Sequence, residues 1–279
     1  MTSVLNKMNN LTQRVITATL GALVVLGAVY MGEWYYFVVF LGICIFTQLE
    51  FYRLVGLDGM IPLKTFGTIS GGFIFVLFFL VERGTLDQHV FFLILPLVSG
   101  IYLIKLYKKA DTKPFANIAI TFLGILYIAI PISLFSVVAY FPDHYGHEII
   151  TGVMLLLWAS DTGAYFAGSR FGKRKLFERI SPKKSWEGSI GGTVLALIIA
   201  WCLSHYFHSL TLYQWLGIAI ITVISGTYGD LVESLFKRSI DIKDSGKSIP
   251  GHGGFLDRFD SVLLSMPFIV AYLKIVILS

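Results

Sequence analysis

The chain has 279 residues, of which 56% are hydrophobic and only 14% are charged, and its mean hydropathy is +0.75. So much apolar surface cannot be hidden from water in one globular core, which excludes a soluble protein and indicates an integral membrane protein. The net charge of +5 does not indicate nucleic-acid binding, because the cations lie in loops beside apolar segments rather than in a soluble basic domain. No nucleic acid is therefore expected as a partner.

Apolar segments that each approach the bilayer-spanning length of about 20 residues follow one another along the whole chain. They predict an all-α polytopic membrane protein with about nine transmembrane helices. The segments cover residues 15–31, 34–54, 66–82, 90–107, 115–140, 149–169, 188–207, 212–232 and 259–278. We divide the chain into N-terminal and middle transmembrane helices, residues 1–140, and a C-terminal catalytic transmembrane region, residues 141–279.

Lysine and arginine are distributed unevenly among the loops. All 22 of them except Arg83 and Lys274 fall in alternate loops, which share one side of the membrane. The positive-inside rule places those loops and the N-terminus in the cytoplasm. A compact chain of this kind is typical of the bacterial inner membrane, which is the location that we expect.

The first of two strongly charged loops covers residues 170–187. It contains two lysines flanked by hydroxyl groups, directly before a helix that is expected to begin near Ser185. Such groups at the positive end of a helix are suited to phosphate binding. The residues predicted here to form a phosphate-binding segment are Ser181, Pro182, Lys183, Lys184, Ser185 and Glu187, and Glu187 is also placed to act as a capping carboxylate. A loop that only sets the topology is the alternative.

The second charged loop covers residues 233–260 and mixes carboxylates with cations. Asp257 and Asp260 are three residues apart at the start of the last apolar segment, so a helix would place both on one face. Hard oxygen ligands of this kind suit Mg²⁺, although helix capping is an equally good explanation of the two aspartates. Asp230 and Glu233 repeat the spacing, and we interpret Glu233 as an ordinary i,i+4 partner of Lys237.

One further carboxylate, Asp161, interrupts an apolar segment, where a charge costs about 2.5–3.5 kcal/mol on insertion scales. A charge retained at such a cost indicates a functional residue, and a structural polar contact between helices is the alternative. The glycine-rich turn at residues 250–254 would let the backbone approach a ligand closely. It is equally consistent with a tight turn into the membrane.

These residues resemble the CDP-diacylglycerol synthases, or phosphatidate cytidylyltransferases. The C-terminal signature of that family is matched at Ser234, Phe236, Lys237, Arg238, Lys243, Asp244, Gly246, Ile249, Pro250, His252, Gly253, Gly254, Phe255, Asp257, Arg258, Phe259 and Asp260. The segment SPKKSWEG is similar to a second hallmark, with Ser185 at a position where Thr is also common. The motifs cover the last 130 or so residues, and the first four segments match the family only in hydrophobicity and length.

The resemblance implies a many-helix membrane fold, a homodimer, and a polar cavity open to the cytoplasm and the bilayer. It implies a Mg²⁺-dependent nucleotidyltransferase that converts CTP and phosphatidic acid into CDP-diacylglycerol and pyrophosphate. A second cation is a further option. It also implies that Asp230, Asp257 and Asp260 bear on metal binding and that the segment SPKK bears on the nucleotide. We add Asp161 as a nearby metal candidate.

The remaining polar residues of the signature are assigned by their chemistry. The cations are expected to hold lipid phosphate or pyrophosphate, and His252 to position a substrate. The catalytic candidates are Asp230, Asp257, Asp260, Lys237, Arg238, Arg258 and His252, and Lys243, Asp244, Gly253 and Gly254 are added to the nucleotide-binding set. The alternatives are a CTP-dependent lipid kinase of the polyprenol type and a non-enzymatic anion transporter.

Overall fold

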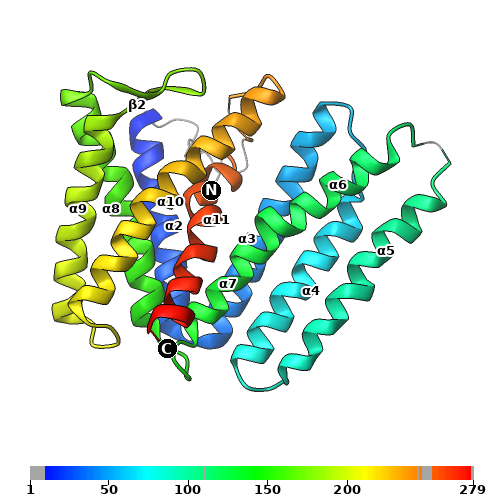
Figure 1. Ribbon diagram of the computed structural model, residues 1–279, viewed down its shortest axis with the longest axis horizontal. Helices are drawn as coiled ribbons and strands as arrows, with labels where there is room; N and C mark the ends of the chain where they lie inside the picture. Colours follow the sequence, from blue (N-terminus) through cyan, green and yellow to red (C-terminus); the bar gives the residue numbers. More distant parts are fainter. Residues whose placement is uncertain (1–9, 110, 244, 247–252, 278–279) are drawn as a thin grey trace. The chain divides into compact units, whose positions relative to one another are not determined.

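The structure is a computed structural model and describes residues 10–109, 111–243, 245–246 and 253–277. Helices dominate, because the backbone groups of a chain in a bilayer must be hydrogen-bonded internally. The helices and strands are α2 (Asn10–Met31), α3 (Glu33–Leu57), α4 (Lys64–Glu82), η1 (Gln88–Leu93), α5 (Ile94–Leu106), α6 (Pro114–Gly124), η2 (Ile125–Ala129), α7 (Ile130–Ala139), α8 (His147–Phe171), β1 (Lys175–Phe177), β2 (Ser181–Ser185), α9 (Trp186–Tyr206), α10 (Leu212–Ser239), α11 (Leu256–Ala271) and η3 (Tyr272–Ile277) (Figure 1).

Within the described residues, eight helical segments are long and apolar enough to cross a membrane. They correspond to the last eight of the nine apolar segments that the sequence predicts. The first predicted segment lies in α2, whose apolar part, Val15–Met31, is shorter than the others. The all-α polytopic class is therefore confirmed, whereas the count of nine spans stays a prediction.

The helices on either side of the second charged loop are longer than hydropathy predicts. α10 continues to Ser239, and α11 begins at Leu256, so part of the expected loop at residues 233–260 is helical. Lys237 and Arg238 lie in the last turn of α10, where cations are favoured by the helix dipole. Such polar stabilisation extends a helix beyond its apolar segment and is invisible to a hydropathy scan.

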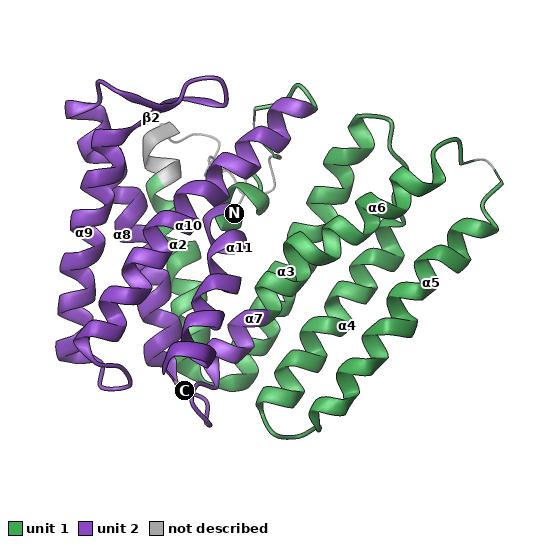
Figure 2. Ribbon diagram, viewed as in Figure 1, with its two compact units in different colours: residues 1–133, 240–259 green, residues 134–239, 260–279 purple. Residues whose placement is uncertain are grey.

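The chain divides into two compact units, which Figure 2 distinguishes by colour. Unit 1 comprises residues 1–133 and 240–259, and unit 2 comprises residues 134–239 and 260–279. In unit 1 the helices α4, α5 and α6 share an apolar core, with η2 continuing from α6. Its buried residues are Leu63, Ile74, Ile101, Ile118 and Ile125.

A buried ion pair stabilises the connection between α5 and α6 in unit 1. Lys105 pairs with Asp111 and also donates to the carbonyl oxygen of Ile61 at 2.6 Å. Asn117 donates to the Asp111 carboxylate at 2.6 Å and accepts the Ile61 N–H at 2.7 Å. The hydrogen bond from Lys105 is the largest influence on the pKa of Asp111, which lies below its usual value. This network joins the connections that precede α4 and α6.

In unit 2, α8 and α9 lie side by side in Figure 1, and small residues allow their backbones to approach closely. A Cβ atom on Gly192 of α9 would lie 2.7 Å from the carbonyl oxygen of Ser160 on α8. Between these two helices the first charged loop contains a short antiparallel hairpin, in which Lys175 of β1 lies opposite Ser185 of β2. The sequence predicts a charged loop at residues 170–187, but not its strands.

Candidate active site

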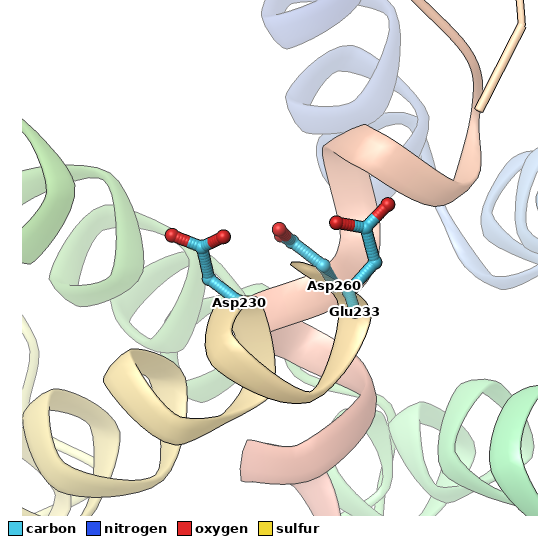
Figure 3. Close-up of side chains that lie close together, drawn as sticks. All are labelled: Asp230, Glu233 and Asp260. Carbon is cyan, nitrogen blue, oxygen red and sulfur yellow. The ribbon is translucent and has the colours of Figure 1, made fainter. Parts of the chain in front are cut away.

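Three carboxylates gather in unit 2, and we call them the carboxylate cluster. Asp230 and Glu233 are on α10 and Asp260 is on α11, and one oxygen of each lies within 4.8 Å of the others. Figure 3 shows that the three side chains project in the same direction from the two helices. The structure thus brings together Asp230 and Asp260, as the family resemblance implies, and adds Glu233.

A glycine explains how α10 and α11 approach each other at this cluster. A Cβ atom on Gly229 would lie 2.7 Å from the carbonyl oxygen of Asp260 and 3.1 Å from the Cα of Ser261. Backbone atoms cannot move aside as a flexible side chain can, so only glycine fits here without a shift of the helices. Gly229 therefore sets the separation of the backbones that carry Asp230 and Asp260.

Two lysines lie beside the carboxylate cluster. Lys184 Nζ is 2.5 Å from an oxygen of Asp230 and donates to the carbonyl oxygen of Thr227 at 3.2 Å. Lys237 Nζ is 2.6 Å from an oxygen of Glu233, whose side chain is completely buried. The i,i+4 pair expected of Glu233 and Lys237 is confirmed, and the same carboxylate also belongs to the cluster.

The predicted intramembrane carboxylate, Asp161, lies on α8 and is exposed on the surface of the chain. Its charge acts on Asp260 together with the charges of Asp230 and Lys184. Asp161 is not a member of the cluster as defined by distance, although it belongs to the same electrostatic environment. Several like charges in one region destabilise one another unless a cation or a proton compensates them.

The predicted phosphate-binding segment forms β2 and the start of α9. Pro182 and Lys183 are exposed, whereas Lys184 is half-buried and Ser185 is buried. Ser185 is the N-cap of α9, because its hydroxyl accepts the N–H of Gly188 at 3.2 Å. The expected helix start near Ser185 is therefore confirmed.

Glu187 lies in the first turn of α9, as expected for an acidic residue near a helix N-terminus. Its carboxylate also reaches back to the chain that precedes the hairpin. It accepts the N–H of Lys173 at 3.0 Å and that of Arg174 at 3.2 Å. Glu187 therefore anchors the base of the hairpin to α9.

In unit 1, the Asp257 carboxylate binds backbone amides. It accepts the N–H of Ser245 at 3.1 Å and the N–H of Gly254 at 3.0 Å. This is the capping role that the sequence allows as an alternative to metal binding, and the metal role of Asp257 stays a prediction. Gly253 has a positive φ of 86°, a conformation that few other residues adopt readily.

The structure gives less information about the other predicted site residues. Lys243 and Arg258 in unit 1 and Arg238 at the end of α10 in unit 2 are exposed. Asp244 and His252 lie outside the described residues, so their predicted roles are not addressed by the structure.

The sequence analysis missed one buried carboxylate, Glu50 of α3, which is 4% exposed. It accepts the N–H of Phe255 and the N–H of Leu256, both at 3.1 Å. A signal was available, because Glu50 interrupts the apolar segment at residues 34–54 as Asp161 interrupts its own. The criterion that selected Asp161 should have selected Glu50 as well.

The donor set of the carboxylate cluster fits a hard divalent cation. Carboxylate oxygens are the ligands that Mg²⁺ prefers, and Mg²⁺ commonly combines one or two of them with substrate phosphates. The adjacent ammonium groups of Lys184 and Lys237 could bind phosphate oxygens at the same place. Carboxylates and ammonium groups on facing elements therefore form an arrangement suited to a metal-bound polyphosphate.

The comparisons of this chain with known proteins agree with one another. The model of the cytidylyltransferase family matches residues 12–276. The phosphatidate cytidylyltransferase of Haemophilus influenzae is 36% identical over 285 aligned residues, covering 92% of this chain and 96% of the relative. That of Bacillus subtilis is 34% identical, covering 94% and 97% of the two chains. That of Staphylococcus aureus strain COL is 40% identical over 56% of this chain and 58% of its own.

Proposed function

We propose that this chain, which belongs to the cytidylyltransferase family, is a phosphatidate cytidylyltransferase that converts CTP and phosphatidic acid into CDP-diacylglycerol and pyrophosphate. The observation that carries the proposal is the carboxylate cluster with Lys184 and Lys237 beside it, in a chain related over nearly its full length to proteins of that name. Eight apolar helices are consistent with a substrate and a product that both stay in the bilayer.

The reaction joins a phosphatidate oxygen to the α-phosphorus of CTP and breaks the bond from that phosphorus to the oxygen of the β-phosphate. Pyrophosphate leaves with the bonding electron pair. Because the phosphatidate oxygen is already anionic, no strong general base is required, and catalysis consists mainly of positioning and of neutralising charge. His252 is accordingly proposed as a positioning donor rather than a proton carrier.

Mg²⁺ is the proposed cofactor, and Asp230, Asp260 and Glu233 would hold it. Asp257 and Asp161 are further candidate ligands. A second cation is also part of the proposal. When bound, the metal supplies charge neutralisation at the phosphate oxygens. The protein's own part is to hold these carboxylates at short separations, which Gly229 makes possible.

The basic residues divide into two proposed groups. Lys183, Lys184 and Ser185 bind the triphosphate, and Lys237, Arg238 and Arg258 bind the lipid phosphate or the departing pyrophosphate. The positions of Lys184 beside Asp230 and of Lys237 beside Glu233 support contact with a ligand bound at the cluster. We assign Ser181, Pro182, Glu187, Lys243, Asp244, Gly253 and Gly254 to shaping the nucleotide site.

The remaining features of the proposal concern the membrane and the assembly. We place nine spans in a bacterial inner membrane, with the N-terminus, the two charged loops and a polar cavity facing the cytoplasm, as the distribution of lysine and arginine indicates. We place the catalytic region in residues 141–279 and propose a homodimer, which rests on the family resemblance.

The proposal is tested with purified protein in detergent, phosphatidic acid, Mg²⁺ and CTP labelled either in the cytosine or in the γ-phosphate. We expect cytosine label in the lipid and γ-label in pyrophosphate, and we expect Asp230→Asn to lose both signals. Transfer of γ-label to the lipid would instead make the chain a lipid kinase. Failure to transfer either label, in a protein that binds CTP, would contradict an enzymatic role and favour anion transport.

A further inference from the structure

The N-terminus of α11 is bound by a carboxylate from a distant part of the sequence. Glu50 lies on α3, buried in unit 1, and accepts the N–H groups of Phe255 and Leu256 at 3.1 Å each. It also accepts the hydroxyl of Ser245, which is itself buried. Glu50 thus contacts both sides of the segment that leads into α11.

These contacts satisfy groups that a helix cannot satisfy itself. The first N–H groups of a helix have no partner within it, and the positive end of the helix dipole attracts a negative charge. Hydrogen bonds from N–H groups to a charged carboxylate are about twice as strong as neutral ones. Glu50 therefore acts as an N-terminal cap for α11, although it is about 200 residues away in sequence.

The packing around this carboxylate leaves no room for another side chain. A Cβ atom on Gly254 would collide with Ser245 Oγ and with the Glu50 carboxylate. One turn of α3 beyond Glu50, Arg53 donates to the carbonyl oxygen of Ser245 at 3.4 Å. In this chain the close approach of Glu50 and Ser245 therefore explains the glycine at residue 254.

We propose that Glu50 is a positioning residue for cytidylyl transfer, acting through its contacts with Ser245, Phe255 and Leu256 to fix the start of α11. This inference rests on the proposed function. The helix that Glu50 caps carries Asp257, Arg258 and Asp260, all assigned above to metal or phosphate binding. Glu50 does not itself need to touch the substrate, because it determines where α11 begins and how its first turn is oriented.

The test compares Glu50→Gln, Glu50→Asp and Ser245→Ala with Asp111→Asn. Asp111 is a matched control, because it is also a buried carboxylate of unit 1 with backbone and side-chain donors, and it lies in a different connection. For each purified variant we would measure thermal unfolding, the half-saturating concentrations of Mg²⁺ and CTP, and kcat. Amide hydrogen exchange of peptides covering residues 253–258 would report directly on the cap.

We expect Glu50→Gln to raise the half-saturating Mg²⁺ concentration by about 10- to 100-fold, the range typical of residues that orient metal ligands. The amides of Phe255 and Leu256 should exchange faster, and Glu50→Asp should restore part of the Mg²⁺ affinity. Ser245→Ala should shift the Mg²⁺ dependence in the same direction, and the double variant should show less than the product of the two single effects. Asp111→Asn should lower the unfolding temperature without changing the Mg²⁺ dependence.

A purely structural role would give a different result. If Glu50→Gln only reduced the amount of active protein, with unchanged Mg²⁺ and CTP dependence in the remainder, the inference would be overturned. Unchanged amide exchange at residues 253–258 would also overturn it. If wild type fails to form CDP-diacylglycerol, the proposed function fails, whereas accelerated exchange in Glu50→Gln would still establish the cap.

Discussion

The described part of the chain contains two groupings of carboxylates with lysines, one buried and one partly exposed, and their composition differs. In the first, a single carboxylate, Asp111, meets an ammonium group, an amide side chain and a backbone N–H. In the second, Asp230, Glu233 and Asp260 crowd together, and only two ammonium groups accompany the three carboxylates. The first grouping has matched charges, and the second has an excess of negative charge.

This difference separates a structural network from a ligand site. A buried charge is tolerated when it is paired and hydrogen-bonded, as Asp111 is. An excess of like charges destabilises the folded state unless a ligand compensates it, so it persists where binding a cation is useful. The balance of charge distinguishes the two sites, and so does burial, because the Lys105–Asp111 pair is buried and the Lys184–Asp230 pair is partly exposed.

The largest expected effect comes from removing one charge from the cluster. Asp260→Asn keeps the shape of the side chain but removes an oxygen charge at the proposed metal site, so activity should fall by at least about 100-fold. Steady-state assays across a range of Mg²⁺ concentrations measure this loss. Wild-type activity in Asp260→Asn would show that the cluster is not the metal site.

A smaller loss is expected from Lys184→Gln. Removing a charge-assisted contact to phosphate costs about 1.5–3 kcal/mol, which corresponds to about a 10- to 100-fold increase in the KM for CTP. The matched control is Lys175→Gln, an exposed lysine on the partner strand of the same hairpin. Equal effects from both variants would indicate general attraction of an anion to the hairpin instead of a specific contact.

Asp111→Asn should affect stability and leave activity per folded molecule unchanged. It leaves the Lys105 ammonium group buried without its counter-charge, which costs about 3–5 kcal/mol for a buried pair. Thermal unfolding in detergent measures the change, and activity is normalised to folded protein. A fall in specific activity without a fall in stability would show that Asp111 does not belong to a purely structural network.

The smallest effect is a pH dependence of stability. The pKa of Asp111 lies below its usual value because Lys105 and other donors bind the charged form, so its stabilisation is complete above the ordinary aspartate range near pH 4. That stabilisation is lost as the pH falls through the lowered pKa. Unfolding between pH values of about 3 and 7 should show this loss in wild type. Asp111→Asn should lack that part of the acid dependence. A pH profile of unfolding identical to that of wild type would contradict this prediction.

The fold class could be predicted from hydropathy because transmembrane helices are long and chemically uniform. The eight described spans coincide with eight predicted segments, and the Ser185 helix start follows from local capping chemistry. The exact ends of α10 and α11 could not be predicted, because charged contacts extend them past the apolar segments. Local sequence specifies the start of α9 at Ser185, whereas the start of α11 depends on the distant residue Glu50.

The candidate site was predicted in part. The pairing of Asp230 with Asp260 was expected from the family resemblance, and the structure brings the two together. Glu233 was recognised only as the partner of Lys237, because an i,i+4 spacing is visible in sequence and a contact with another helix is not. Glu50 could have been found as a charge within an apolar segment, but its partners, about 200 residues away, could not be predicted.

The contact at Gly229 also bears on how the site responds to the surrounding lipid. Transmembrane helices change their tilt when the thickness of the bilayer changes. When two helices tilt relative to each other, their ends separate most and their point of closest contact separates least. The Gly229–Asp260 contact is a point of close approach between α10 and α11, with Asp230 the next residue on α10. The spacing of Asp230 and Asp260 should therefore change less between thin and thick membranes than the spacing of the helix ends.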